Sequence, residues 1–221
     1  MYQIKKIDLS PALDGDWNSS GWDRANVLKV ACVRPESSDH HPDVQCKLLH
    51  DGRRIYGMFR VEDRYVRCVA ENYNDSVCTD SCVEFFVEPP GGKGYLNFEF
   101  SGNGAFLLYH VRDPRRTANG FADFSPVSKE NAAAIRIATT LPRKVEQEIT
   151  EPLTWFLAFD IPVELFEKQM GCSYSGLSGQ QWRANFYKCG DHTSHPHWIS
   201  WQPVSELNFH LPQCFGDIRF E

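Results

Sequence analysis

The stretch from Asp80 to Gly104 constrains the fold of this chain more than any other, because its side chains alternate between apolar and polar with a period of two. Successive side chains of a β-strand point to opposite faces of a sheet, so this period predicts strands rather than helices. We expect the apolar members to face a core, and the opposite face to carry carboxylates, an amide and aromatic rings. The core-facing set is Val83, Phe85, Val87, Leu96, Phe98 and Phe100, and the opposite set is Glu84, Phe86, Glu88, Tyr95, Asn97 and Glu99.

The turn after this stretch predicts how the next strand pairs. If Gly102 and Asn103 form a two-residue hairpin loop, Ser101 lies opposite Gly104 and Tyr95 opposite His110. The same register pairs Phe98 with Leu107 and Leu96 with Tyr109 on the core face, and Glu99 with Phe106 and Asn97 with Leu108 on the other face. A sheet face of carboxylates, amides and rings suits a ligand with hydroxyls on its edge and C–H groups on its flat side, such as a sugar. A solvated outer face, with its rings covered by a loop, is the simpler interpretation.

The remaining chain has the pattern of an all-β protein. Many short alternating segments and no repeat predict an antiparallel β-sandwich. The hairpin signal Asp51-Gly52 joins two such segments, and a single short helix is expected at Val163–Met170, with Gly171 ending it. The polar stretch Asp113–Asn131 is expected to be a long connection, either functional or disordered. No Pro/Ser/Gly-rich linker divides the 221 residues, so we expect one domain over residues 1–221.

Composition and charge restrict the partners. Hydrophobic residues make up 42% of the chain, which is enough for a substantial core, and the net charge is −6. The only basic cluster is Arg112, Arg115 and Arg116, so no nucleic-acid partner is expected. No 18-residue apolar run exists, so no membrane partner is expected either. Residues 1–8 lack the apolar core of a secretory signal; either the chain stays in the cytoplasm, or a leader has been removed.

The eight cysteines form no C-x-x-C pair and no regular framework, so we interpret them as mostly reduced thiols. Cys46 and Cys82 are expected to behave as small hydrophobes in strands. One loop gathers possible zinc ligands, and for it a polar loop with incidental histidines is the favoured interpretation, with no metal assigned. These residues are Cys189, His192, His195 and His197.

Carboxylates on the polar face raise the question of glycoside hydrolysis, which needs two carboxyl groups flanking the scissile bond. Glu84 and Glu88 would lie about 13 Å apart along one strand, while Glu99 could be closer across strands. Nothing in the sequence indicates the apolar enclosure that would raise the pKa of either group, so we expect no catalytic residues and no enzyme activity. A haem-binding sandwich is a further alternative, with Met58 and His110 as axial-ligand candidates.

Five stretches, in order, resemble one family. Asp80–Pro89 resembles the strand D-D/S-x-V-E-x-F-x-x-P of carbohydrate-binding module family 9 and of its stand-alone relatives. Each motif is weak alone, but five in register are specific, and the similarity spans about residues 5–220. The other four stretches are an early hairpin over 48–63, a turn over 100–104, late strands over 182–188 and 200–203, and a closing motif over 208–216.

This resemblance implies a jelly-roll β-sandwich that binds oligo- or polysaccharide, often at chain ends, without cleaving it. It implies a carbohydrate partner, with association with glycoside hydrolases as an option. It implies no cofactor; family members can carry structural Ca²⁺, but its ligands cannot be matched to residues of this chain. Glu84 matches the ligand-binding glutamate of the family, and Asn97 and Lys188 fall near positions of polar sugar contacts.

The chain departs from the family where the sugar ring would be held between two tryptophans. Cys78 stands at about the first of these positions, and Phe209 or His210 at the second. Trp201 and Tyr95 remain as further stacking surfaces. Losing both tryptophans would remove contacts worth several kcal/mol, given about 1.5–3 kcal/mol for each large apolar side chain that is buried. A β-sandwich scaffold that has lost the sugar site is therefore the alternative to a binding module.

Overall fold

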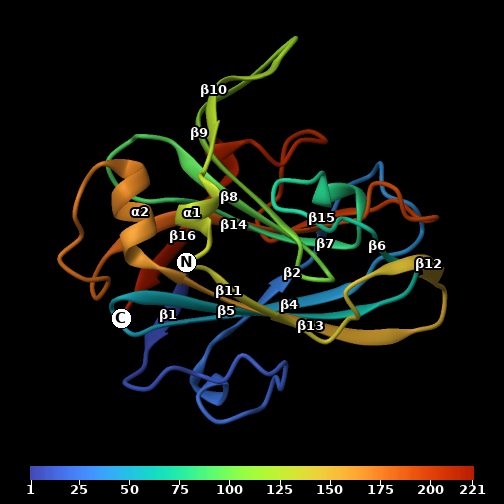
Figure 1. The fold of residues 1–221 in the computed structure, drawn as a ribbon, viewed down its shortest axis with the longest axis horizontal. Coiled ribbons are helices and arrows are strands. Elements are labelled where there is room, and N and C mark those ends of the chain that lie inside the picture. Colours follow the sequence, from blue (N-terminus) through green and yellow to red (C-terminus); the bar gives the residue numbers. More distant parts are fainter.

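The computed structural model describes residues 1–221 and shows two layers of β-sheet packed face to face (Figure 1). In the first layer the strands follow the order β10-β9-β8-β7-β14-β16, and in the second β4-β5-β13-β11. Strand β1 connects the layers, because it pairs in parallel with β16 on one side and with β4 on the other. All other pairings are antiparallel, which confirms the predicted β-sandwich.

The first layer consists of β7 (Cys82–Glu88), β8 (Tyr95–Ser101), β9 (Phe106–Thr117), β10 (Gly120–Pro126), β14 (Gln181–Cys189) and β16 (Gly216–Phe220), with β15 (Trp198–Ser200) and β3 (Cys32–Val33) at its margin. The second consists of β2 (Val27–Val30), β4 (Asp43–His50), β5 (Arg54–Asp63), β11 (Arg136–Thr139) and β13 (Leu153–Pro162), and β1 is Tyr2–Lys6. Strands β6 (Val66–Cys68) and β12 (Val145–Ile149) pair separately. The helices are α1 (Lys129–Ala132) and α2 (Val163–Met170), and short 3-10 turns lie at Trp22–Arg24, Val77–Thr79 and Pro212–Cys214.

The core lies between the two layers and contains the whole predicted core-facing set. Phe85 of β7 stacks on Phe98 of β8 at 6.1 Å between ring centroids, and on Phe159 of β13, across the sandwich, at 6.0 Å. The predicted opposite face is also confirmed, since Glu84, Asn97 and Glu99 lie on the outer side of the first layer, away from these rings.

The predicted helix at Val163–Met170 is confirmed to the residue, but it is not the single helix expected, because the four-residue α1 is also present. Helix α2 spans Val163–Met170 and buries Val163, Leu165, Phe166 and Met170. It ends at Gly171, whose φ of +60° is in the left-handed region that glycine enters without steric cost. Neither helix has the length and apolar composition of a membrane span.

The predicted register of the β8–β9 hairpin is wrong by one residue. Phe98 lies opposite Leu108, Asn97 opposite Tyr109, and Glu99 opposite Leu107. The loop has three residues instead of two: Gly104, at φ +91°, donates its N–H to Ser101 O at 2.8 Å, and Ser101 N donates to Ala105 O at 2.8 Å. This is a turn with a glycine bulge, and the extra residue moves Leu107 and Tyr109 to the outer face and His110 off it.

The early hairpin is confirmed, but its turn is formed by Gly52 and Arg53 rather than by Asp51 and Gly52. His50 pairs with Ile55, and Gly52 has a φ of +90°. The Asp51 carboxylate instead accepts the backbone N–H groups of Arg53 and Arg54 at 2.8 and 2.7 Å.

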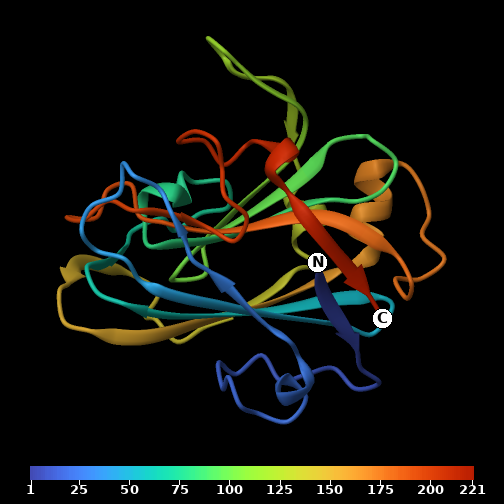
Figure 2. The ribbon, with the colours of Figure 1, turned by 180° about the vertical axis from the view of Figure 1, so that it is seen from behind.

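The stretch expected as a long connection is mostly a hairpin. Strand β9 continues to Thr117, and β10 returns from Gly120 to Pro126, so that the two project from the body at the top of Figure 1. Register shifts between Phe121 and Phe124 interrupt the period-two pattern, which is why the sequence does not show these strands. The view from behind shows both chain ends close together where β1 meets β16 (Figure 2).

Candidate functional site

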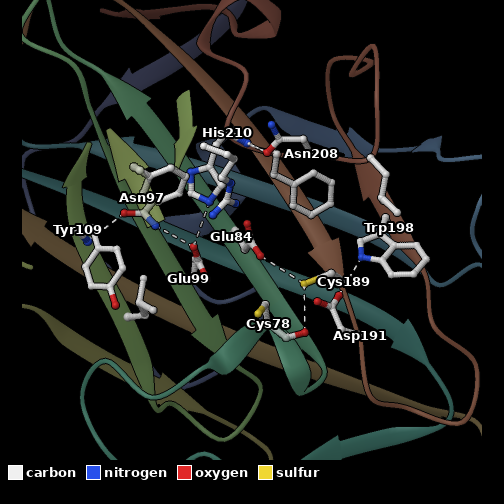
Figure 3. A pocket seen from close by; sticks show the side chains of 15 residues that line it. Cys78, Glu84, Asn97, Glu99, Tyr109, Cys189, Asp191, Trp198, Asn208 and His210 are labelled. Carbon is white, nitrogen blue, oxygen red and sulfur yellow. Dashed lines mark hydrogen bonds and ion pairs between the residues drawn. The ribbon is translucent and has the colours of Figure 1, made fainter. Parts of the chain in front are cut away.

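A pocket of about 400 Å³ opens on the outer face of the first layer, over β7, β8 and β9. Loops after β14 and β15, and Arg116 and Phe121 next to the turn of the β9–β10 hairpin, complete its walls (Figure 3). Its volume is within the range of small-molecule sites. The lining residues are Cys78, Glu84, Asn97, Glu99, Leu107, Tyr109, Arg116, Phe121, Cys189, Asp191, Trp198, Leu207, Asn208, Phe209 and His210.

Two carboxyl groups form the floor of the pocket. Glu84 and Glu99 lie directly opposite each other on β7 and β8, and only 2% and 7% of their surfaces are exposed. Burial raises the pKa of Glu99 to about 7. Burial, together with the charge of Glu99, raises the pKa of Glu84 well above its ordinary value. The expectation that neither carboxyl is enclosed is therefore wrong: the loops that enclose the pair are distant in sequence.

Hydrogen bonds orient this floor. Asn97 Nδ2 donates to Glu99 Oε1 at 2.8 Å, while Asn97 Oδ1 accepts the backbone N–H of Tyr109 at 2.9 Å. Asn97 thus fixes Glu99 to the sheet. Glu84 Oε1 accepts from the Cys189 thiol at 3.3 Å, whereas Glu84 Oε2 is buried and has no partner within the protein. A buried oxygen without a partner is costly, so it is the atom of the pocket with most to gain from a ligand.

Aromatic rings and a neutral histidine form the walls. Tyr109 and Trp198 lie on opposite sides of the carboxyl pair (Figure 3). Trp198 Nε1 donates to Asp191 Oδ1 at 2.8 Å, and Phe209 is stacked on a buried tyrosine ring at 4.1 Å between centroids. Burial lowers the pKa of His210 to about 3, so this ring is neutral at physiological pH.

Four of the residues predicted for the site lie together in the pocket: Glu84, Asn97, Phe209 and His210. Cys78, which the resemblance places at about the first tryptophan position, also lines it. Tyr95 lies behind the wall, where its hydroxyl shares a hydrogen bond of 2.8 Å with His210 Nδ1.

Lys188 and Trp201 are not at the pocket. Lys188 pairs with Val83 and therefore shares its core-facing phase; its Nζ is buried, lies 3.5 Å from Asp63 Oδ2 and donates to Cys189 O at 2.9 Å. The expectation that Lys188 lies near a sugar contact is therefore wrong, because its place along β14 directs its side chain into the core. Trp201 packs against Phe186 of the main core, with 5.7 Å between ring centroids.

The possible zinc ligands of the late loop do not converge. His197 Nε2 lies 2.6 Å from the Lys188 amine, and His195 stacks on Tyr65 at 3.7 Å between centroids. The two haem-ligand candidates are also separate, because Met58 is on β5 in the second layer and His110 is on β9 in the first.

Sequence reasoning missed part of the pocket for identifiable reasons. Leu107 and Tyr109 were displaced by the one-residue register error. Cys189 had a usable signal, since it alternates with Lys188 along β14 and lies opposite Cys82. Asp191 and Trp198 come from a loop and a margin strand, whose approach to β7 only the tertiary fold sets.

The sandwich, with an enclosed and ring-walled pocket on one outer face, has the form of a ligand-binding β-sandwich module. The chain matches the model of carbohydrate-binding family 9 over residues 21–220, and it belongs to that family. None of the curated proteins compared with the chain matches it.

Solved structures agree on the fold. The chain is similar to a protein from Bacteroides uniformis for which carbohydrate binding is proposed, with a TM-score of 0.84 and 29% identity over 99% of this chain and 98% of that one. It also shares the fold of a family 9 carbohydrate-binding module from Caldicellulosiruptor kristjanssonii. In complex with cellotriose that module gives a TM-score of 0.65 and 13% identity, over 100% of this chain and 93% of that one. In complex with glucose it gives 0.62 and 13%, over 99% and 95%.

Proposed function

We propose that this protein binds carbohydrate, as oligosaccharide or as polysaccharide chain ends, in the pocket above Glu84 and Glu99, and does not cleave it. The observation that carries the proposal is the combination of a carboxyl floor and aromatic walls in one enclosed cavity. Sugar hydroxyls need polar partners along the ring edge, while the C–H face of the ring packs on aromatic surface. Tyr109 and Trp198 offer that surface in place of the tryptophan pair.

Glu84 is the central hydrogen-bonding group in this proposal, because its Oε2 has no protein partner. In the ionised state this oxygen accepts a sugar O–H, and in the protonated state the carboxyl also donates. Asn97 acts indirectly, since both ends of its amide are already bonded to Glu99 and to the β9 backbone.

Recognition without cleavage fits the placement of the two carboxyl groups. Glycosidases place their carboxyls on either side of the scissile bond. Glu84 and Glu99 project from the same face of one sheet, so both meet a bound sugar from below. We therefore expect no release of reducing sugar from oligosaccharides or chromogenic glycosides, and turnover abolished by Glu84→Gln would overturn this part of the proposal.

If the chain were a scaffold that had lost the sugar site, the groove beside Glu84 would be absent or filled. The polar stretch Asp113–Asn131 forms mostly the projecting β9–β10 hairpin, and of its residues only Arg116 and Phe121, which pair next to the turn of that hairpin, line the pocket. The groove beside Glu84 is thus present as a cavity of about 400 Å³, which favours the binding module.

Calorimetry with cellotriose, glucose and a wider glycan panel tests the proposal. Trp198→Ala should weaken the best ligand at least about 10-fold, because the buried ring surface is worth about 1.5–3 kcal/mol. Trp198→Phe keeps a ring but loses the bond to Asp191, so it separates stacking from orientation. Trp17→Ala, a half-buried tryptophan outside the pocket, is the matched control and should leave affinity unchanged. Silence of the folded protein toward every glycan would refute sugar binding.

A further inference from the structure

Two thiols and a carboxylate meet beneath the floor of the pocket. Cys82 and Glu84 are two residues apart on β7, so their side chains point to the same face, and Cys189 of β14 lies directly opposite Cys82. The two Sγ atoms and a Glu84 carboxylate oxygen all lie within 4.8 Å of one another. All three residues are almost completely buried, and neither cysteine is in a disulfide.

The spacing of these atoms matches one face of a tetrahedral zinc site. Zn–S bonds of about 2.3 Å and Zn–O bonds of about 2.0–2.2 Å give a sulfur–oxygen edge of about 3.6 Å in a tetrahedron. Glu84 Oε1 lies 3.3 Å from Cys189 Sγ and 3.9 Å from Cys82 Sγ, on either side of that value. Because all three ligands come from paired strands, the arrangement is held by the sheet rather than by a flexible loop.

We propose that Cys82, Cys189 and Glu84 form a binding site for a divalent cation that prefers sulfur ligands, and that this cation is Zn²⁺. Two sulfur ligands disfavour Ca²⁺ and Mg²⁺, which take oxygen ligands, and favour zinc. Glu84 binds through Oε1, and the unpartnered Oε2 shows that the carboxyl is not satisfied by the protein alone. Glu84 and Cys189 line the pocket, which provides the path by which the ion enters and a side from which a fourth ligand can come.

The charges around the cluster also favour a cation. Asp191 and Glu99 line the same pocket, and the only basic side chain among the lining residues is the exposed Arg116 at its rim. The buried amine of Lys188 is on the opposite face of the sheet, since Lys188 pairs with the core-facing Val83.

Metal titration of the reduced, metal-free chain tests the site without any sugar, so its result is separate from that of the carbohydrate experiment. We expect one Zn²⁺ per chain by calorimetry and elemental analysis. With Co²⁺ as the probe, we expect the sulfur-to-cobalt charge-transfer absorption of thiolate ligation. Cys82→Ser and Cys189→Ser should each weaken binding at least about 10-fold, because losing even an outer partner of a metal ligand costs 10–100-fold.

Cys172→Ser is the matched control, because it removes an exposed thiol away from the cluster and should change nothing. Glu84→Gln should weaken Zn²⁺ while retaining both thiols. The cobalt spectrum of the unmodified chain needs no variant, so it decides the question even if a serine variant fails to fold. Absence of Zn²⁺ uptake by the folded, reduced protein would overturn the site, as would uptake that is unchanged in both cysteine variants.

Discussion

Replacing Glu99 by Gln should make the protein more stable at alkaline pH, and the size of the gain follows from the carboxyl pair. Burial raises the pKa of Glu99 from 4.5 to about 7. Because folding raises its pKa, Glu99 contributes stability that is fully present below pH 4.5, and this contribution is lost as the pH rises through 7. A difference of about 2.5 pKa units corresponds to about 3 kcal/mol. Gln cannot ionise, but its carbonyl can still accept the Asn97 amide.

We therefore expect the difference in unfolding free energy between Glu99→Gln and the parent to grow by about 3 kcal/mol in favour of the variant between pH 4 and pH 8. Urea unfolding followed by tryptophan fluorescence at several pH values measures it. The control is Glu146→Gln, whose carboxyl is 77% exposed and whose effect should stay within about 0.5 kcal/mol at every pH. If the curves for Glu99→Gln and the parent run parallel with pH, the burial of this carboxyl does not act as described.

Two further substitutions test the core and the corrected position of Lys188. Lys188→Met should cost about 3–5 kcal/mol of stability in urea unfolding, because it leaves the buried Asp63 carboxylate without the Lys188 ammonium group. The folded variant should keep its affinity for sugar, and a large loss of affinity would restore Lys188 to the site. Gly57→Ala should destabilise by at least about 1–3 kcal/mol, because the added Cβ would lie 2.1 Å from a ring atom of its cross-strand partner Phe159. An unchanged thermal midpoint would show that the Phe159 ring packs less closely over Gly57 than the structure indicates.

The sequence by itself determined the sandwich, the helix and the two faces of the central strands. Val83 and Phe85 alternate with Glu84 and Phe86, and such a period leaves a strand only one way to bury its apolar side. The helix at Val163–Met170 has a proline before it, a glycine after it and one apolar face, so local signals alone set its ends. These features depend on neighbours within a few residues, and a sequence shows them directly.

Only the tertiary structure decided the register of the hairpin and the composition of the pocket. One bulged glycine, Gly104, placed Tyr109 on the outer face, and nothing in the alternation distinguishes a loop of two residues from one of three. Trp198 and Asp191 reach the carboxyl pair from parts of the chain about 100 residues away. The enclosure that raises the pKa of Glu84 comes from those distant loops. Desolvation depends on everything packed around a group, so it cannot be inferred from the strand that carries it.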